Sequence, residues 1–129
     1  MGEVFLARDE RLGRAVAIKR IRIDAPVHDD LRERLRREAR AAASLNHPAI
    51  VHVYDVLAAE GEDWIVFEYV AGESLAELVS RGELDAGAAL DLGREIAEGL
   101  AHAHARGVIH RDLKAENVRV TPDRRAKIL

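Results

Sequence analysis

The residues best suited to chemistry lie within ten consecutive positions, 108 to 117, which read V-I-H-R-D-L-K-A-E-N. The side chains that stand out are an imidazole, a carboxylate, two cations and a carboxamide, carried by His110, Asp112, Arg111, Lys114 and Asn117. Phosphoryl transfer needs an acid that accepts a proton, cations that neutralise phosphate charge and oxygen ligands that hold magnesium. The stretch therefore suits phosphoryl transfer. The alternative is a polar turn between a helix and a strand.

This stretch resembles the catalytic loop of eukaryotic-type (Hanks-type) serine/threonine protein kinases, whose signature is H-R-D-L-x-x-x-N. Every fixed position of that signature is matched, and Lys114 resembles the serine/threonine-specific form rather than the tyrosine-specific one. The resemblance implies that Asp112 orients a substrate hydroxyl and accepts its proton, that Lys114 neutralises the γ-phosphate, and that Asn117 is a magnesium ligand. It gives His110 and Arg111 the role of bracing the loop.

A second motif, V-A-I-K at positions 16–19, matches a kinase strand whose lysine pairs with the α- and β-phosphates of ATP. The resemblance assigns that role to Lys19 and places Val4 and Ala17 against adenine. Gly2 would be the last glycine of the family's glycine-rich loop, of which only Gly2 and Val4 are present. The alternative for Lys19 is an ordinary lysine at the end of a strand, with its ammonium in water.

A helix is expected over residues 27–45, because apolar residues recur there at helical spacing. They are Leu31, Leu35, Ala39, Ala42 and Leu45. Glu38 falls on the same stripe, where a carboxylate is costly unless it is paired. The kinase resemblance predicts an ion pair between Glu38 and Lys19, and the alternative partner is Arg34 on the same helix.

The strand expected over residues 64–70, W-I-V-F-E-Y-V, resembles the kinase strand that enters the hinge between the two lobes. This resemblance makes Phe67 the residue behind adenine. It gives the backbone carbonyl of Glu68 and the backbone amide and carbonyl of Val70 to the adenine edge. A plain core strand would contain the same residues.

The predicted fold class is α+β, a protein-kinase-like arrangement of an antiparallel sheet with one helix followed by the helical beginning of a second lobe. Residues 1–70 are assigned to the smaller lobe and residues 71–129 to the start of the larger one. In the second part, helices are expected over 75–80 and 84–106, and a hairpin over 118–120 and 126–129. In the family an Asp-Phe-Gly triplet follows such a hairpin, and its aspartate is a principal magnesium ligand. The 129 residues do not include this triplet. We therefore expect the 129 residues alone to show little or no turnover and poor stability.

Composition limits the partners. The chain has 129 residues, a net charge of −3 and no cysteine, which excludes disulfides and thiolate metal sites and fits a reducing cytoplasm. No apolar run is long enough to cross a membrane. The expected partners are ATP, Mg²⁺ and a protein with a serine or threonine. Nucleic acid is not expected, because glutamates interleave with the arginines of the first helix, which then presents a solvated face. Those arginines are Arg32, Arg34, Arg36, Arg37 and Arg40.

Two other functions stay open. One is a non-catalytic nucleotide-binding or pseudokinase-type interaction module. The other is a small-molecule phosphotransferase of related fold, which ranks lower because such proteins typically carry glycine where Arg111 stands. One departure from the kinase pattern concerns the nucleotide itself. Arg119 occupies a position where the family usually has an apolar side chain under adenine, so it is expected to crowd or flank the nucleotide.

Overall fold

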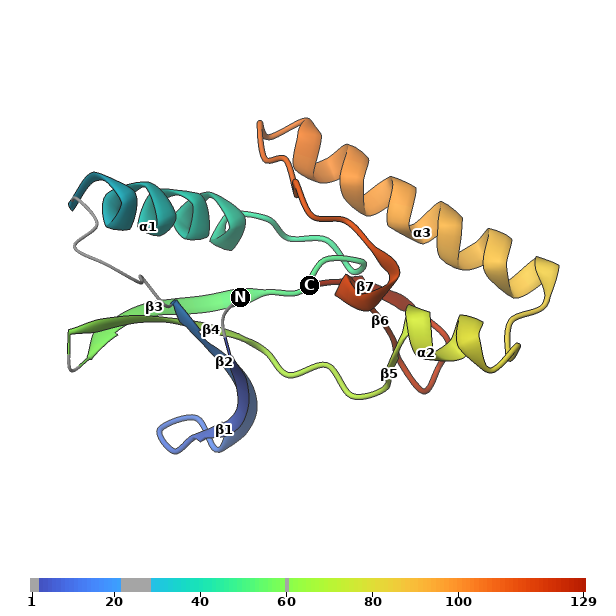
Figure 1. The fold of residues 1–129 in the computed structure, drawn as a ribbon, viewed down its shortest axis with the longest axis horizontal. Coiled ribbons are helices and arrows are strands. Elements are labelled where there is room, and N and C mark those ends of the chain that lie inside the picture. Colours follow the sequence, from blue (N-terminus) through green and yellow to red (C-terminus); the bar gives the residue numbers. More distant parts are fainter. Residues whose placement is uncertain (1–2, 22–28, 60) are drawn as a thin grey trace. The chain divides into compact units, whose positions relative to one another are not determined.

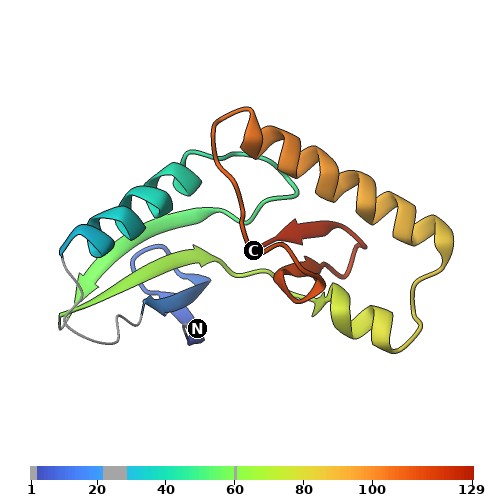
Figure 2. The same ribbon diagram turned by 45° about the horizontal axis from the view of Figure 1, so that its top comes forward.

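The computed structural model describes the backbone of residues 3–21, 29–59 and 61–129, while the side chains of residues 29–32 and 35 lie outside the description. The chain divides into two compact units. The first contains Met1–Ser44 and His52–Tyr69, and the second contains Leu45–Val51 and Val70–Leu129. Figures 1 and 2 show a sheet and a helix in the first unit, and helices with short strands in the second. The predicted α+β class is confirmed.

The first unit is an antiparallel sheet with the strand order β1-β2-β4-β3. Its strands are β1 (Val4–Asp9), β2 (Arg14–Ile21), β3 (Val53–Ala59) and β4 (Glu62–Glu68). Strand β2 is the V-A-I-K strand, and it pairs with β1 on one side and β4 on the other. Because side chains alternate along a strand, this register decides which residues share a face with Lys19.

Helix α1 (Asp29–Ala43) packs against β3 in the same unit, and Figure 1 shows it lying along one face of the sheet. Its Arg36 donates to Asp63 Oδ1 of β4 through Nη2 at 2.6 Å and Nε at 3.1 Å. The Asp63 side chain is only 4% exposed, so this ion pair is largely shielded from water. Removing one partner would leave the other charge poorly solvated, which makes the pair a firm attachment of α1 to the sheet.

The second unit contains helices α2 (Leu75–Ser80) and α3 (Ala86–His104) and a sheet of β5 (Glu73–Ser74), β6 (Val118–Val120) and β7 (Ala126–Ile128). Ser74 begins α2 with a capping box. Its hydroxyl accepts a hydrogen bond from the Glu77 backbone amide, and the Glu77 carboxylate accepts one from the Ser74 backbone amide. Asp85 caps α3 through the Ala88 amide at 2.8 Å.

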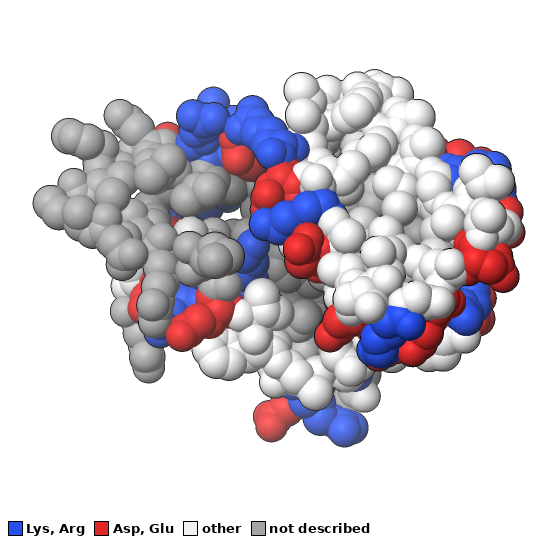
Figure 3. Space-filling model, turned by 45° about the vertical axis from the view of Figure 1, so that its right-hand side comes forward, with Lys and Arg blue, Asp and Glu red and all other residues white. Residues whose placement is uncertain are grey.

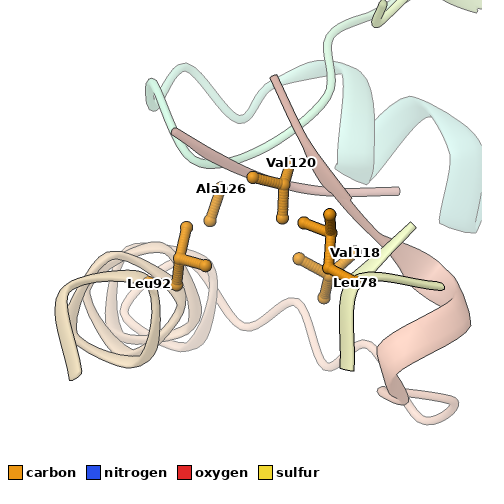
Figure 4. Close-up of a cluster of buried hydrophobic side chains, with 5 residues drawn as sticks. All are labelled: Leu78, Leu92, Val118, Val120 and Ala126. Carbon is orange, nitrogen blue, oxygen red and sulfur yellow. The ribbon is translucent and has the colours of Figure 1, made fainter. Parts of the chain in front are cut away.

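The core of this unit joins both helices to the sheet. Its buried side chains are Leu78, Leu92, Val118, Val120 and Ala126, and Figure 4 shows them pointing toward one another. Buried Glu95 of α3 reinforces the packing, because its carboxylate accepts from the Ala126 amide at 2.8 Å and from Arg125 Nε at 2.6 Å. The hairpin of β6 and β7, which follows the loop of residues 108–117, is therefore fixed to α3 by both apolar and polar contacts.

Several predicted elements are confirmed and others shift. Helix α2 and strand β6 have the predicted bounds, while α3 is two residues shorter at each end than the predicted 84–106. The predicted strand 64–70 begins two residues after the start of β4. Glu62 and Asp63 belong to β4, where Arg36 supplies a partner for the Asp63 carboxylate. Strand β5 was not predicted.

Replacing Gly72 with alanine is expected to destabilise the protein by at least about 2 kcal/mol, because left-handed backbone disfavours L side chains and the new Cβ also meets backbone. Gly72 has φ of 121°, and a Cβ there would collide with the backbone carbonyl of Val120. The matched control is Gly82→Ala, at φ of 65° with open space around it, which should cost about 1 kcal/mol. Urea unfolding would measure both, and equal losses would contradict the steric explanation.

Two surface properties bear on partners. Within the described ranges, no helix is both long and apolar enough to cross a membrane. On the face drawn in Figure 3, lysine and arginine side chains lie next to aspartate and glutamate side chains rather than forming one continuous basic area. Along α1 the same mixing is seen in the pairs Arg34–Glu38 and Arg36–Asp63.

Candidate active site

The loop from His110 to Asn117 lies in the second unit, and its first residue is fixed by two hydrogen bonds. The Asp112 amide donates to His110 Nδ1 at 3.3 Å. Because Nδ1 accepts, the ring proton lies on Nε2, which donates to the Leu129 carbonyl at 2.7 Å. The imidazole thus connects the start of the loop to the residue after β7. Such a connection is compatible with the bracing role that the sequence resemblance implies for His110.

Asp112 lies at the centre of a small group of contacts. Its Oδ2 atom is 3.1 Å from Lys114 Nζ and accepts a hydrogen bond from Asn117 Nδ2 at 3.0 Å. The same Asn117 amide donates to the Asp112 carbonyl at 2.8 Å. The backbone of Asn117 is held as well, since its backbone amide donates to the Lys114 carbonyl and its backbone carbonyl accepts from the Leu129 backbone amide. The structure therefore brings together the three residues predicted to be catalytic.

These contacts leave two oxygen atoms available. Both described partners of the Asp112 carboxylate use Oδ2, so no described residue hydrogen-bonds Oδ1. Asn117 uses its Nδ2 group as the donor, so its Oδ1 has no described donor either. A free carboxylate oxygen can accept a proton, and a free amide oxygen can bind a hard cation. Both functions predicted for this loop thus have an atom to perform them.

The pKa of Asp112 is held below its usual 3.8, mainly by the hydrogen bonds from Lys114 and Asn117, with the Lys114 charge adding to the effect. The carboxylate is therefore ionised throughout the neutral range. Because its folded pKa is lowered, its contacts stabilise the folded state above the usual pKa, and that contribution is lost as the pH falls through the folded value.

Replacing Lys114 with methionine should raise the pKa of Asp112 toward its usual value, because Lys114 is the largest cause of the shift. A carboxyl ¹³C NMR titration would measure this change. Asp123 is an internal control, because its pKa is lowered chiefly by Thr121 and should not respond. An unchanged Asp112 titration in the variant would show that Lys114 does not act on this carboxylate.

The residue before Asp112 adopts strained backbone. Arg111 has φ of 66°, in the left-handed region that non-glycine residues seldom occupy. Such strain costs of order 1–3 kcal/mol and often occurs at functional sites, where the surrounding structure holds it in place. Here the hydrogen bonds of His110 and Asn117 on either side of Arg111 keep the loop in this shape.

In the first unit, the register places three predicted nucleotide-binding residues on one face of the sheet. Val4 lies directly opposite Lys19 on β1 and β2, and Ala17 follows on the same face, two residues before Lys19. Lys19 is exposed, and its ammonium makes no ion pair with any residue that the structure describes. An unpaired cation beside small apolar side chains is a suitable surface for a phosphate and the ring of a nucleotide.

The predicted ion pair between Lys19 and Glu38 is not formed in the described part of the chain. Glu38 accepts from Arg34 Nε at 3.2 Å, and its side chain is 46% exposed instead of buried on the apolar stripe. Its neighbour Ala39 is the buried residue of that turn. The alternative partner, Arg34, is thus the one found, because an arginine one turn away competes locally with a lysine on another element.

The remaining predicted residues are placed as follows. The Glu68 amide donates to the His52 carbonyl at 2.8 Å, and its carboxylate accepts from the His52 amide at 3.2 Å. Val70 is buried in the second unit. Gly2 lies outside the described residues, as do the side chains of Leu31 and Leu35.

Arg119 lies on the side of β6 opposite to the core. Its neighbours Val118 and Val120 point inward and are 2% and 4% exposed, so strand alternation turns Arg119 outward. Arg119 helps to lower the pKa of Glu77, although the main causes are the hydrogen bonds of Glu77 with Ser74. The Glu77 carboxylate is therefore a nearby group of opposite charge to the Arg119 guanidinium.

Two features of the site were missed from the sequence. The Leu129 backbone fixes both His110 and Asn117, and the Arg36–Asp63 pair fixes α1. Neither has a local signal, because each joins residues at least twelve positions apart in the chain.

The chain is similar in sequence to a known protein family and to several individual proteins. A sequence model of the family described as "Protein kinase domain" matches residues 1–129. Serine/threonine-protein kinase pkn2 of Myxococcus xanthus is 42% identical over 127 residues, which are 98% of this chain and 15% of that protein. PrkC of Bacillus subtilis is 41% identical over 119 residues, covering 92% of this chain and 18% of that protein. PknB of Mycolicibacterium smegmatis is 40% identical over 134 residues, covering 100% of this chain and 21% of that protein. The chain thus spans only a minor part of the length of these relatives.

Proposed function

The chain belongs to the protein kinase domain family, and on this premise we propose that it forms part of a domain that transfers the γ-phosphoryl group of ATP to a serine or threonine of a protein. We assign residues 1–70 to the smaller lobe and residues 71–129 to the start of the larger one. The observation that carries the proposal is the geometry of Asp112. Lys114 and Asn117 both engage Oδ2, which leaves Oδ1 for a substrate hydroxyl.

In the proposed reaction, Asp112 Oδ1 accepts the proton of the hydroxyl while the hydroxyl oxygen attacks the γ-phosphorus. The new O–P bond forms as the bond from the γ-phosphorus to the bridging oxygen breaks, so ADP leaves with the electron pair. Lys114 neutralises charge on the transferred group, a fixed electrostatic effect that requires no rearrangement during the reaction. Lys19 binds the α- and β-phosphates.

Magnesium fits the donor chemistry of Asn117. Mg²⁺ prefers oxygen ligands, and Asn117 Oδ1 has no described donor. When bound, the ion would neutralise charge on the phosphates. Within the described ranges, no group of three or more His, Asp or Glu residues could hold a metal. From the family resemblance we also propose that the 129 residues tested alone show little turnover, so activity should be measured on the protein that carries this chain.

The adenine contacts are proposed from the family resemblance. Val4 and Ala17 would pack on the ring, and the backbone of Glu68 and Val70 would bind its edge. Phosphate binding by Lys19 is supported by its exposed, unpaired ammonium. Glu38 would become its partner only after leaving Arg34, so the Lys19–Glu38 pair remains a prediction for the nucleotide-bound state.

A substrate panel tests the proposal. The protein that carries this chain would be given ATP with serine and threonine peptides, and separately with aminoglycosides and choline. Transfer to the peptides alone is the expected result. Transfer to a small molecule would favour the small-molecule phosphotransferase, and ATP binding without any transfer would favour the non-catalytic module.

A further inference from the structure

Residues 45–51 form a segment that packs in the second unit although it follows α1 in the chain. Leu45 and Ile50 are buried together with Ala103 of α3. The Val51 amide donates to the Ile128 carbonyl at 2.9 Å, and the Ile128 amide donates to the Ala49 carbonyl at 2.8 Å. The segment is thus held by an apolar cluster and by a short backbone ladder with β7.

Two imidazoles meet where this segment contacts α3. The ring centroids of His47 and His102 are 5.1 Å apart, with the planes tilted by 46°. The Ala49 amide donates to His47 Nδ1 at 3.1 Å. Arg106 Nη1 lies 3.2 Å from His102 Nδ1, and a guanidinium can only donate, so this nitrogen accepts as well. Each neutral ring therefore has a donor directed at Nδ1 and carries its own proton on Nε2.

The charges around His102 do not favour a proton. The guanidinium of Arg106, two residues after the end of α3, and the ring of His47 in the segment both act on it. Glu98, one turn earlier on α3, is paired with Arg94 at 3.0 Å. No carboxylate of the described residues contacts either ring, and His102 Nε2 is buried without a hydrogen-bond partner among them. Burial, Arg106 and His47 together hold the pKa of His102 below its usual value of 6.5.

We propose that His47, His102 and Arg106 form an acid-sensitive latch that holds residues 45–51 on α3 at neutral pH and releases them on acidification. A proton on Nδ1 of His102 would face the N–H donor of Arg106, which converts an attractive contact into a repulsive one. On His102 it would also add a second positive charge beside Arg106. The segment follows α1 directly in the chain, so its release would free the end of the helix that carries Glu38.

The direction of the effect follows from linkage. A histidine whose pKa is lowered in the attached state contributes its full stabilisation above its usual pKa and loses it as the pH falls below that value. For one such group, the equilibrium constant for release rises by up to about tenfold per pH unit in this range. The latch is independent of the proposed phosphoryl transfer, because it uses none of the residues assigned to that reaction.

Hydrogen exchange of the intact protein tests this proposal. Exchange of the backbone amides of residues 45–51, corrected for intrinsic rates, would be measured by mass spectrometry between pH 7.5 and 5.5 (roughly one unit either side of the usual histidine pKa). Wild type should exchange up to about tenfold faster per pH unit below the usual pKa, and His102→Gln should remove this dependence. The matched control is His104→Gln, an exposed histidine of the same helix, which should behave as wild type.

A corrected exchange rate that does not change with pH in wild type, or the same dependence in His102→Gln, would overturn the latch. If His102→Gln does not fold, an NMR titration of the wild-type imidazoles decides the matter. His102 should titrate below its usual pKa, and titration at or above that value would contradict the proposal.

Discussion

Replacing Asp112 with asparagine is expected to lower the rate of phosphoryl transfer by about 10³-fold, the contribution typical of a positioned general base. Asparagine retains the shape and one oxygen, but it cannot accept a proton at neutral pH. It also loses the charge that attracts Lys114 at 3.1 Å. The loss should fall on kcat, while KM for ATP changes little, because no phosphate contact is assigned to Asp112.

The control for this variant is Asp91→Asn. Asp91 is an exposed residue of α3 whose side chain makes no hydrogen bond or ion pair with any described residue, so the same change of charge there should leave kcat unaltered. Thermal unfolding of both variants would exclude a folding defect. Retention of more than about a tenth of the wild-type kcat by the folded Asp112→Asn protein would show that Asp112 is not the base.

Replacing Lys19 with methionine is expected to reduce kcat/KM by about 10²–10³-fold, the range seen when one electrostatic contact to a developing charge is removed. Methionine keeps much of the apolar length of lysine, so packing beside Val4 and Ile65 should be preserved. Binding of an ATP analogue should weaken in parallel, because Lys19 is assigned to the α- and β-phosphates.

Arg40→Met is the matched control in the same unit, because Arg40 is an exposed cation of α1 with no described ion pair. Calorimetric titration with the analogue would compare the two variants. Equal affinity of wild type and Lys19→Met for the ATP analogue would show that Lys19 does not bind the nucleotide. This result would not depend on the outcome for Asp112.

Local signals predicted the parts of this chain that local interactions determine. The helix expected over 75–80 is α2, and the V-A-I-K motif expected on a strand lies on β2. The catalytic loop was recognisable because its residues lie within ten positions and contact one another, as Asp112, Lys114 and Asn117 do. In these elements, residues that are close together in the sequence are also close together in the structure.

Long-range pairing accounts for what could not be predicted. The partner of Glu38 depended on whether Arg34 or Lys19 lay closer, which spacing along the chain does not decide. Asp63 belongs to β4, where its carboxylate pairs with Arg36 of α1, 27 positions away in the chain. The contact of His47 with His102 joins residues far apart in the sequence, so no local pattern indicates it.

The central claim is that Asp112 activates a serine or threonine hydroxyl for attack on ATP. Its most direct test is phosphoamino-acid analysis after the protein that carries this chain is incubated with γ-labelled ATP and magnesium. We expect the label on serine or threonine, and its loss when Asp112 is replaced with asparagine but not when Asp91 is. Label that persists at wild-type level in the folded Asp112→Asn protein would contradict the account.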